Sequence, residues 1–189
     1  MTSTVQAIVP LSSQTVRAQC RDGSLNQPTT GLAMGYVQTN LVILPSQLAF
    51  EFLLFCQRNP KPCPVLEVLD KGNPQPKQFA PGADIRTDLP RYRVFKSGEL
   101  IEERTDIQQL WTDDMVGILI GCSFSFEEAM LKAGLTIRHI EEEKNVPMYR
   151  TTLNCQPQEA IIQSKPASAI THSPGLMLVT DIKNESLQG

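Results

Sequence analysis

A turn between an apolar run and a helical stretch holds the first candidate for chemistry in this sequence. Gly121, Cys122 and Ser123 stand directly after residues 116–120, which read VGILI, and before a stretch of helical character. In open α/β sheets ligands tend to bind at the carboxyl ends of strands, so the location favours a site. A cysteine nucleophile needs a nearby base, and the sequence places none beside Cys122. Because a buried structural thiol is the commoner case, we predict that Cys122 is structural.

A dense group of charges between residues 84 and 93 is the second candidate. Arg86, Arg91 and Arg93 alternate there with Asp84 and Asp88. A guanidinium group binds both oxygens of a carboxylate through its planar fork. Arg91 and Arg93 share one face if the segment is extended. The same pattern arises when each arginine forms a structural ion pair with a neighbouring carboxylate, and the sequence leaves both interpretations open.

The two histidines differ in their surroundings. His172 lies in the stretch THSPG, and His139 precedes three glutamates. A histidine titrates near neutral pH, so His172 can carry a proton, or it can simply hydrogen-bond within the turn. His139 is expected to be a solvated residue at a helix end. The two are too far apart in sequence to predict a metal cluster, and we predict neither a metal nor another cofactor.

Composition excludes several classes of protein. The formal net charge is −3 and the basic residues are scattered, which argues against a nucleic-acid-binding protein. No apolar run approaches the roughly 20 residues that span a bilayer, so no membrane contact is predicted. Five cysteines without C-x-x-C spacing disfavour a disulfide framework or a zinc ribbon and favour a reducing compartment. The first 21 residues contain no acid and include Arg17 and Arg21, so a mitochondrial location is the alternative to the cytoplasm.

The apolar pattern predicts the elements that must position these residues. Strands are predicted at 40–45, 65–70 and 115–121, with one strand pair turning at 96–98 and another within 169–182. The run at 115–121 is unbroken, which is typical of a central strand buried on both faces. Residues 21–36 are expected to form a loop, and 106–111 a short helix or turn. These elements predict an α/β fold with a mixed sheet.

Two helices complete the predicted fold. Ser46 is expected to cap a helix over 46–56, which is apolar almost all round and is predicted to lie in the core. Ser125 and Glu128 have capping-box spacing before a helix over 126–133, and Gly134 supplies its stop. One domain is predicted over 31–184, between a polar segment at 1–30 and a tail at 185–189.

Six stretches in order resemble one known family. They read GLAMGYVQTNLVILP, FLLFCQRNPKPCP, APGADIRTDLPRYRV, IGCSFSFEEAML, RHIEEEKNVPMYRT and AITHSPGLMLVTDIKN. Together they resemble the hydro-lyase family that includes D-glutamate cyclase, from Gly31 to Asn184. The resemblance implies a lyase that eliminates water, with conversion of D-glutamate to 5-oxo-D-proline as the characterised reaction. It also implies a layered α/β sandwich with a smaller inserted α/β domain. Bacterial members look cytoplasmic, and an animal branch is mitochondrial.

The chain departs from the family pattern at one place. Family members carry several dozen residues after the segment like MYRTTLNC, including a glycine-rich His-Asp-Pro motif and a Pro-Val-Phe-Trp motif. This sequence passes from Cys155 to Gln158 without them. We therefore expect the smaller domain to be largely absent. A non-catalytic family member that binds a small acid or a partner protein is the alternative to an active enzyme, and a chain that does not fold alone is a third.

The resemblance assigns roles to the candidate residues. Cyclising glutamate requires a hold on a dicarboxylate, a base for the ammonium group and an acid for the departing hydroxyl. The candidates for proton transfer are His172, Asp84 and Asp88. The candidates for substrate binding are Arg86, Arg91, Arg93, Ser123, Asn59 and Arg150. Asn59 and Lys61 could line the opening of the same site, or their proline-rich turn could serve only to end the preceding helix. We expect Arg86, Arg91, Ser123 and His172 to converge on one cleft that binds a small dicarboxylate or amino acid. The sequence leaves open whether the chain forms a homo-oligomer.

Overall fold

The computed structural model describes residues 11–122, 124–142, 152, 154–157, 168–172 and 178–183. For residues 124–126, 128, 139, 168–172 and 178–183 it describes the backbone only. The helices are α1 (Ser13–Arg21), α2 (Ser46–Arg58), α3 (Phe124–Lys132) and α4 (Arg138–Glu141), with a 3-10 turn at Gln108–Leu110. The strands are β1 (Tyr36–Pro45), β2 (Val65–Val68), β3 (Tyr92–Lys96), β4 (Glu99–Arg104), β5 (Met115–Gly121), β6 (Ser168–His172) and β7 (Leu178–Lys183).

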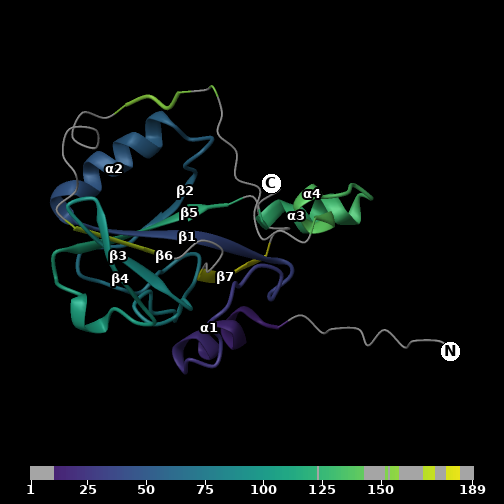
Figure 1. The fold of residues 1–189 in the computed structure, drawn as a ribbon, viewed down its shortest axis with the longest axis horizontal. Coiled ribbons are helices and arrows are strands. Elements are labelled where there is room, and N and C mark those ends of the chain that lie inside the picture. Colours follow the sequence, from purple (N-terminus) through teal and green to yellow (C-terminus); the bar gives the residue numbers. More distant parts are fainter. Residues whose placement is uncertain are drawn as a thin grey trace.

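One seven-stranded sheet organises the chain (Figure 1). Its order is β2-β5-β1-β6-β3-β4, and β7 also pairs with β1. The helices together with this sheet confirm the α/β class. Every described pairing is antiparallel, which differs from the mixed sheet predicted above. Apolar runs reveal strands but not their directions, because direction depends on which strands pair.

β5 is an interior strand, as its sequence predicts. It pairs with β1 along its whole length on one side and with β2 on the other. Its side chains alternate between two clusters: Val116, Ile118 and Ile120 pack beneath α2, whereas Leu119 joins the core on the opposite face. On that opposite face, the loops that contain Ile85 and other apolar residues cover the sheet. Both faces of β5 are therefore buried.

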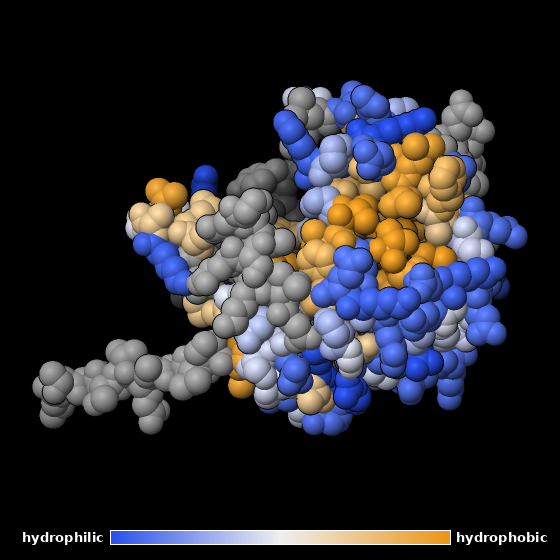
Figure 2. Space-filling view, turned by 180° about the vertical axis from the view of Figure 1, so that it is seen from behind, coloured by the Kyte–Doolittle hydropathy of each residue, from blue (hydrophilic) through white to orange (hydrophobic). Residues whose placement is uncertain are grey.

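α2 covers one face of the sheet but is not buried all round. Ala49 and Cys56 are its buried residues, whereas 68% of Phe50 is exposed. The prediction of a core helix is therefore wrong for its outer side, because the sheet provides only one surface for packing. Figure 2 shows apolar residues gathered in one broad patch on the rear face of the molecule. Ser46 does not cap the helix: its Oγ donates to Asp114 Oδ1 at 2.6 Å, and the N-cap position is Pro45.

The N-terminal part contains a helix that the sequence did not reveal. Ser12 caps α1 by accepting from the Thr15 amide at 3.1 Å. Val16 and Cys20, one helical turn apart, are buried with Leu25 in a small apolar cluster. The expected loop follows α1 as far as β1.

The tight turn at 96–98 and the end of α3 are confirmed, whereas the strand pair predicted within 169–182 is not. Among the described pairings, β6 and β7 each pair with β1 and not with each other. Ser97 and Gly98 both have positive φ, and they form the tight turn between β3 and β4. Gly134 has a φ of 76° and ends α3. α3 begins at Phe124, two residues before the predicted start, so Ser125 lies inside its first turn and the prediction of Ser125 as the N-cap is wrong. The side chains of Ser125 and Glu128 lie outside the described residues. α3 and α4 stand to one side of the sheet in Figure 1. Among the described residues, no helix has the length and apolar character needed to cross a membrane.

Candidate active site

Three predicted site segments meet at one end of the sheet. β5 and β6 are both antiparallel to β1, so they run in the same direction and end at Gly121 and His172. β3 is antiparallel to β6 and begins there, with Tyr92 opposite His172. At a strand spacing of about 4.8 Å, the start of β3 lies one spacing from β6, and β5 lies two spacings, about 10 Å, from β6. β5 also ends two residues farther along β1 than β6 does. The antiparallel topology therefore brings the segment before β3 close to the end of β6.

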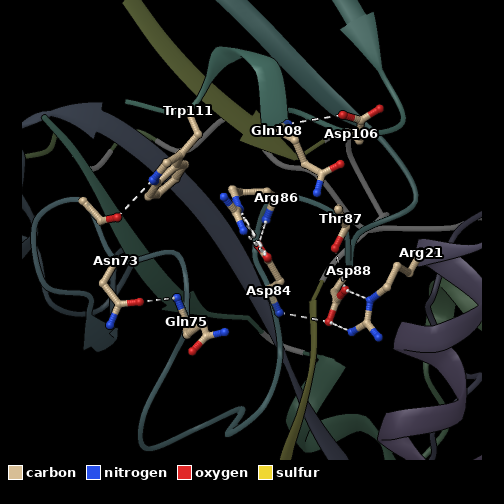
Figure 3. A network of polar contacts seen from close by, with 11 residues as sticks. Arg21, Asn73, Gln75, Asp84, Arg86, Thr87, Asp88, Asp106, Gln108 and Trp111 are labelled. Carbon is tan, nitrogen blue, oxygen red and sulfur yellow. Dashed lines mark hydrogen bonds and ion pairs between the residues drawn. The ribbon is translucent and has the colours of Figure 1, made fainter. Parts of the chain in front are cut away.

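The segment that leads into β3 is fixed by its apolar residues. Ile85 and Leu89 are fully buried in the core that covers one face of the sheet. The Arg86 carbonyl accepts a hydrogen bond from the Ile107 amide at 3.0 Å. As a result, the side chains of Asp84 and Arg86 extend from a well-held turn, as Figure 3 shows.

Arg86 forms a bidentate ion pair with Asp84. Its Nε donates to Asp84 Oδ1 at 2.9 Å and its Nη2 to Oδ2 at 2.6 Å. These hydrogen bonds raise the pKa of Arg86, so the guanidinium stays charged. Its Nη1 has no acceptor among the described residues, and 28% of the Arg86 side chain is exposed. In Figure 3, Gln108 and Trp111 lie around this guanidinium, and Trp111 is held by a 3.1 Å hydrogen bond to the Gly72 carbonyl. The pair thus leaves one nitrogen of a fixed cation available to an anionic ligand.

Asp88 has a different environment from Asp84. Its side chain is fully buried, and it accepts from Arg21 Nε at 2.8 Å and Nη2 at 2.6 Å. The Asp84 amide and the Thr87 hydroxyl also donate to it, at 3.0 and 2.9 Å. Arg17, itself buried, lies 4.0 Å away. Because four donors occupy both oxygens, this geometry favours a structural role for Asp88 over the predicted role in proton transfer.

Arg91 and Arg93 share one face, as predicted, and both meet the same carboxylate. Arg93 Nε donates to Glu103 Oε1 at 2.8 Å, and Arg91 Nη1 lies 3.5 Å from Oε2. Arg91 also lines an open hollow, whose other residues are Glu103, Arg104, Thr105 and Asp106. The structural alternative therefore describes Arg93 well, whereas Arg91 keeps access to a surface hollow.

The remaining predicted residues are placed unequally. The backbone of His172 lies opposite Tyr92, the residue that follows Arg91. The side chain of His172 lies outside the described residues. Ser123 and Arg150 lie wholly outside them. The structure thus brings the 84–93 segment and His172 together, and the convergence of all four side chains stays a prediction.

Asn59 lies at the same end of the sheet but beside β2. Its amide oxygen accepts from the Gln156 backbone N–H at 2.7 Å. Its amide nitrogen donates to the Gln156 and Phe55 carbonyls at 2.9 and 2.8 Å. β2 lies three strand spacings from β6, about 14 Å, and Asn59 is buried. Its position and its occupied amide favour the structural interpretation of the proline-rich turn.

Sequence reasoning missed one feature of this region. The Thr39 side chain is fully buried opposite Gly121, and its hydroxyl has no hydrogen-bond partner in the described part of the chain. A buried hydroxyl without a partner is costly, so it marks a polar position at the end of β5. No signal in the stretch YVQTN distinguishes it from an ordinary strand threonine. Cys122 is half-buried nearby, with its thiol 3.5 Å from the Gln38 carbonyl.

Known proteins resemble this chain over most of its length. The D-glutamate cyclase family model matches residues 116–159. A Geobacillus kaustophilus protein named "putative hydro-lyase" is 59% identical over 146 residues, which cover 77% of this chain and 56% of the relative. A Bacillus subtilis protein of the same name is 55% identical over 150 residues, covering 79% and 58%. The chain spans about half the length of the first curated relatives it matches.

A Bacillus velezensis relative of the same name aligns more extensively. It is 41% identical over 254 residues, covering 94% of this chain and 96% of the relative. The α/β fold and these similarities define one class of protein, and the chain belongs to the hydro-lyase family of these relatives. Because the alignment is longer than the chain, the relative contains residues that have no counterpart here. Where those residues lie stays a prediction.

Proposed function

We propose that this protein is a carbon–oxygen lyase that converts D-glutamate to 5-oxo-D-proline and water. The single observation that supports this most is the shared sheet end, where the Asp84–Arg86 pair precedes β3 and His172 ends β6. The family similarity supplies the reaction class. The proposed compartment is the cytoplasm, which the five free cysteines support, with the mitochondrial matrix as alternative.

The reaction needs an anion site and two proton transfers. The substrate ammonium loses a proton, and its nitrogen attacks the side-chain carboxyl carbon to form the ring C–N bond. The nitrogen then loses a second proton, and one carboxyl oxygen departs with both protons as water. The reaction transfers no electrons between molecules, so its balance requires no redox cofactor.

Each role has a candidate residue. Arg86 Nη1 would bind the α-carboxylate of the substrate, and Asp84 would position the guanidinium rather than touch the substrate. Arg91 is the second cation near this end of the sheet. His172 would move the proton, because imidazole both accepts and donates near neutral pH. Ser123 and Arg150 remain candidates for holding the second carboxylate.

The test measures 5-oxoproline formation by the purified chain and by Arg86→Ala and His172→Ala. The matched control is Arg138→Ala, because Arg138 is 82% exposed on α4 and pairs with Glu142. We expect a large loss of turnover in both site variants and none in the control. Loss of one well-placed catalytic or binding group typically costs a factor of about 100 or more. Parental turnover in both site variants would refute the site.

A non-catalytic binder is the second candidate function. The Bacillus velezensis relative contains residues that have no counterpart here, and in this alternative those residues complete the site of the active relatives. An open site weakens electrostatic stabilisation of a transition state, because water screens it. Melting temperatures measured with D-glutamate and with 5-oxo-D-proline, together with turnover, distinguish the binder from the enzyme. A rise in melting temperature without turnover identifies a binder, and turnover identifies an enzyme.

A further inference from the structure

Three cysteines gather at the C-terminal end of α2. Cys56 is buried in the last turn of α2. Cys63 is half-buried in the proline-rich turn and packs against the apolar cluster that contains Cys56. Cys155 is exposed, and all three are free thiols. In the described part of the chain, no group of three or more histidine, cysteine, aspartate or glutamate side chains is arranged to hold a metal ion, and these three cysteines form no exception.

Asn59 fixes the two chain segments that carry Cys63 and Cys155. The Cys63 amide donates to the Asn59 carbonyl at 3.1 Å. The Asn59 side chain pairs with both backbone groups of Gln156, the residue after Cys155, at 2.7 and 2.9 Å. Arg58 adds a hydrogen bond to the Pro157 carbonyl at 3.1 Å. One asparagine thus holds the Cys63 turn and the Cys155 segment against each other.

The three thiols differ in their access to solvent: Cys56 is buried, Cys63 is half-buried and Cys155 is exposed. Burial, and then the neighbouring Cys63, raise the pKa of Cys56 to about 11, so it remains a protonated donor. Burial and then the charge of Cys155 raise the pKa of Cys63, whereas the hydrogen bond from Cys56 acts to lower it. Cys155 is exposed, so an oxidant reaches it first. Cys63 is the half-buried thiol on the neighbouring segment, and the hydrogen bond from Cys56 offsets only part of the effect of burial on its pKa.

We propose that Cys155 and Cys63 form a reversible disulfide when the protein meets hydrogen peroxide. The Cys155 thiolate attacks one peroxide oxygen, the O–O bond breaks, and sulfenic acid and hydroxide form. The Cys63 thiol then loses its proton, its sulfur attacks the Cys155 sulfur, the S–S bond forms, and the departing hydroxide takes up that proton as water. In sum, two thiols and one peroxide give one disulfide and two waters. A small thiol such as glutathione reverses the step by exchange.

The bond would join the end of α2 to the chain that follows α4. Closing a loop of roughly 90 residues removes entropy from the unfolded chain, so oxidation is expected to raise the melting temperature. The proposal can be tested without the hydro-lyase activity, because thiol counts and crosslinked peptides are its readouts and turnover is not.

The experiment treats the full chain with stoichiometric hydrogen peroxide, then counts free thiols and maps peptides without reduction. We expect the loss of two thiols, one crosslinked peptide that contains Cys63 and Cys155, and full recovery with dithiothreitol. Cys63→Ser and Cys155→Ser should each abolish the crosslink. The matched control Cys122→Ser, a half-buried cysteine outside the cluster, should retain it.

Two results would overturn the proposal. The first is a crosslink between Cys56 and Cys63 in place of Cys63 and Cys155. The second is oxidation of Cys155 to sulfinic acid with no crosslink, which would mean that Cys63 cannot reach it. A melting curve for each variant verifies that it is folded, and Cys63→Ala replaces Cys63→Ser if the serine variant unfolds.

Discussion

Asp88 should be the most important charged side chain for stability in this protein. Its carboxylate is fully buried between α1 and the loop before β3, where it bonds Arg21 through two nitrogens. The informative changes are Asp88→Ala, Arg21→Ala and the double variant. If Asp88 instead acts in proton transfer, its loss would abolish activity and leave stability nearly unchanged. The two roles therefore predict opposite results.

The magnitude follows from what each change leaves behind. Breaking a buried ion pair by removing one partner typically costs about 3–5 kcal/mol. Half of the Arg21 side chain is exposed, so water compensates part of the loss, and we expect about 3 kcal/mol for Asp88→Ala. Arg21→Ala leaves Asp88 its other donors, so about 1–2 kcal/mol is expected. The double variant should cost less than the sum, because the two residues interact directly.

The assay is urea unfolding followed by fluorescence. Trp111 is the single tryptophan, and it packs against the main core, so its emission reports loss of that core. The free energy of unfolding is extrapolated to water for all four proteins. A cost below about 1 kcal/mol for Asp88→Ala would refute the reasoning, since typical total stability is about 5–15 kcal/mol. A larger cost for Arg21→Ala than for Asp88→Ala would refute it as well.

Two further predictions concern the sheet. Gly117→Ala places a Cβ 2.6 Å from Ile85 Cδ1 in the core. We therefore expect the free energy of unfolding, measured in urea, to fall by about 1–3 kcal/mol. A decrease under about 0.5 kcal/mol would contradict this packing. The hydrogen bond from Arg93 lowers the pKa of Glu103 below its unfolded value, so its stabilisation is present above the unfolded pKa and is lost as pH falls through the folded one. The melting temperature of the parent should therefore fall more steeply between about pH 5 and pH 3 than that of Glu103→Gln. Equal slopes for the two proteins would contradict the pairing of Glu103 with Arg93.

The sequence predicted the elements with strong local signals. β5 is apolar without interruption and is interior, and the turn at Ser97-Gly98 needs positive φ. α1 escaped prediction because only Val16 and Cys20 mark its buried face within a polar stretch. The error for α2 has the opposite cause, since apolar residues such as Phe50 occur on both its inner and outer sides. Periodicity thus identifies the buried face of a helix only when its apolar residues lie on one side.

The sequence predicted which residue types gather at the candidate site better than it predicted the ion-pair partner of each residue. The shared face of Arg91 and Arg93 follows from strand geometry alone, and both meet Glu103 as that geometry allows. The partner of Asp88 was not predictable, because Arg21 lies 67 residues away and reaches it only once α1 packs on the domain. Local sequence ranks candidate cations, whereas tertiary structure decides which carboxylates they already hold.

The direction of the strands changes the reason for placing the site at this end of the sheet. The sequence argument used the rule that ligands bind at carboxyl ends of strands in open α/β sheets, which presumes parallel neighbours. Here β1 is antiparallel to both β5 and β6, so those two strands run in the same direction on either side of it, and their registers on β1 place their ends two residues apart. β3, antiparallel to β6, must then begin where β6 ends, which brings the Asp84–Arg86 segment to His172. The convergence is therefore a consequence of antiparallel topology. It holds for the backbone whichever side chain proves to carry the proton.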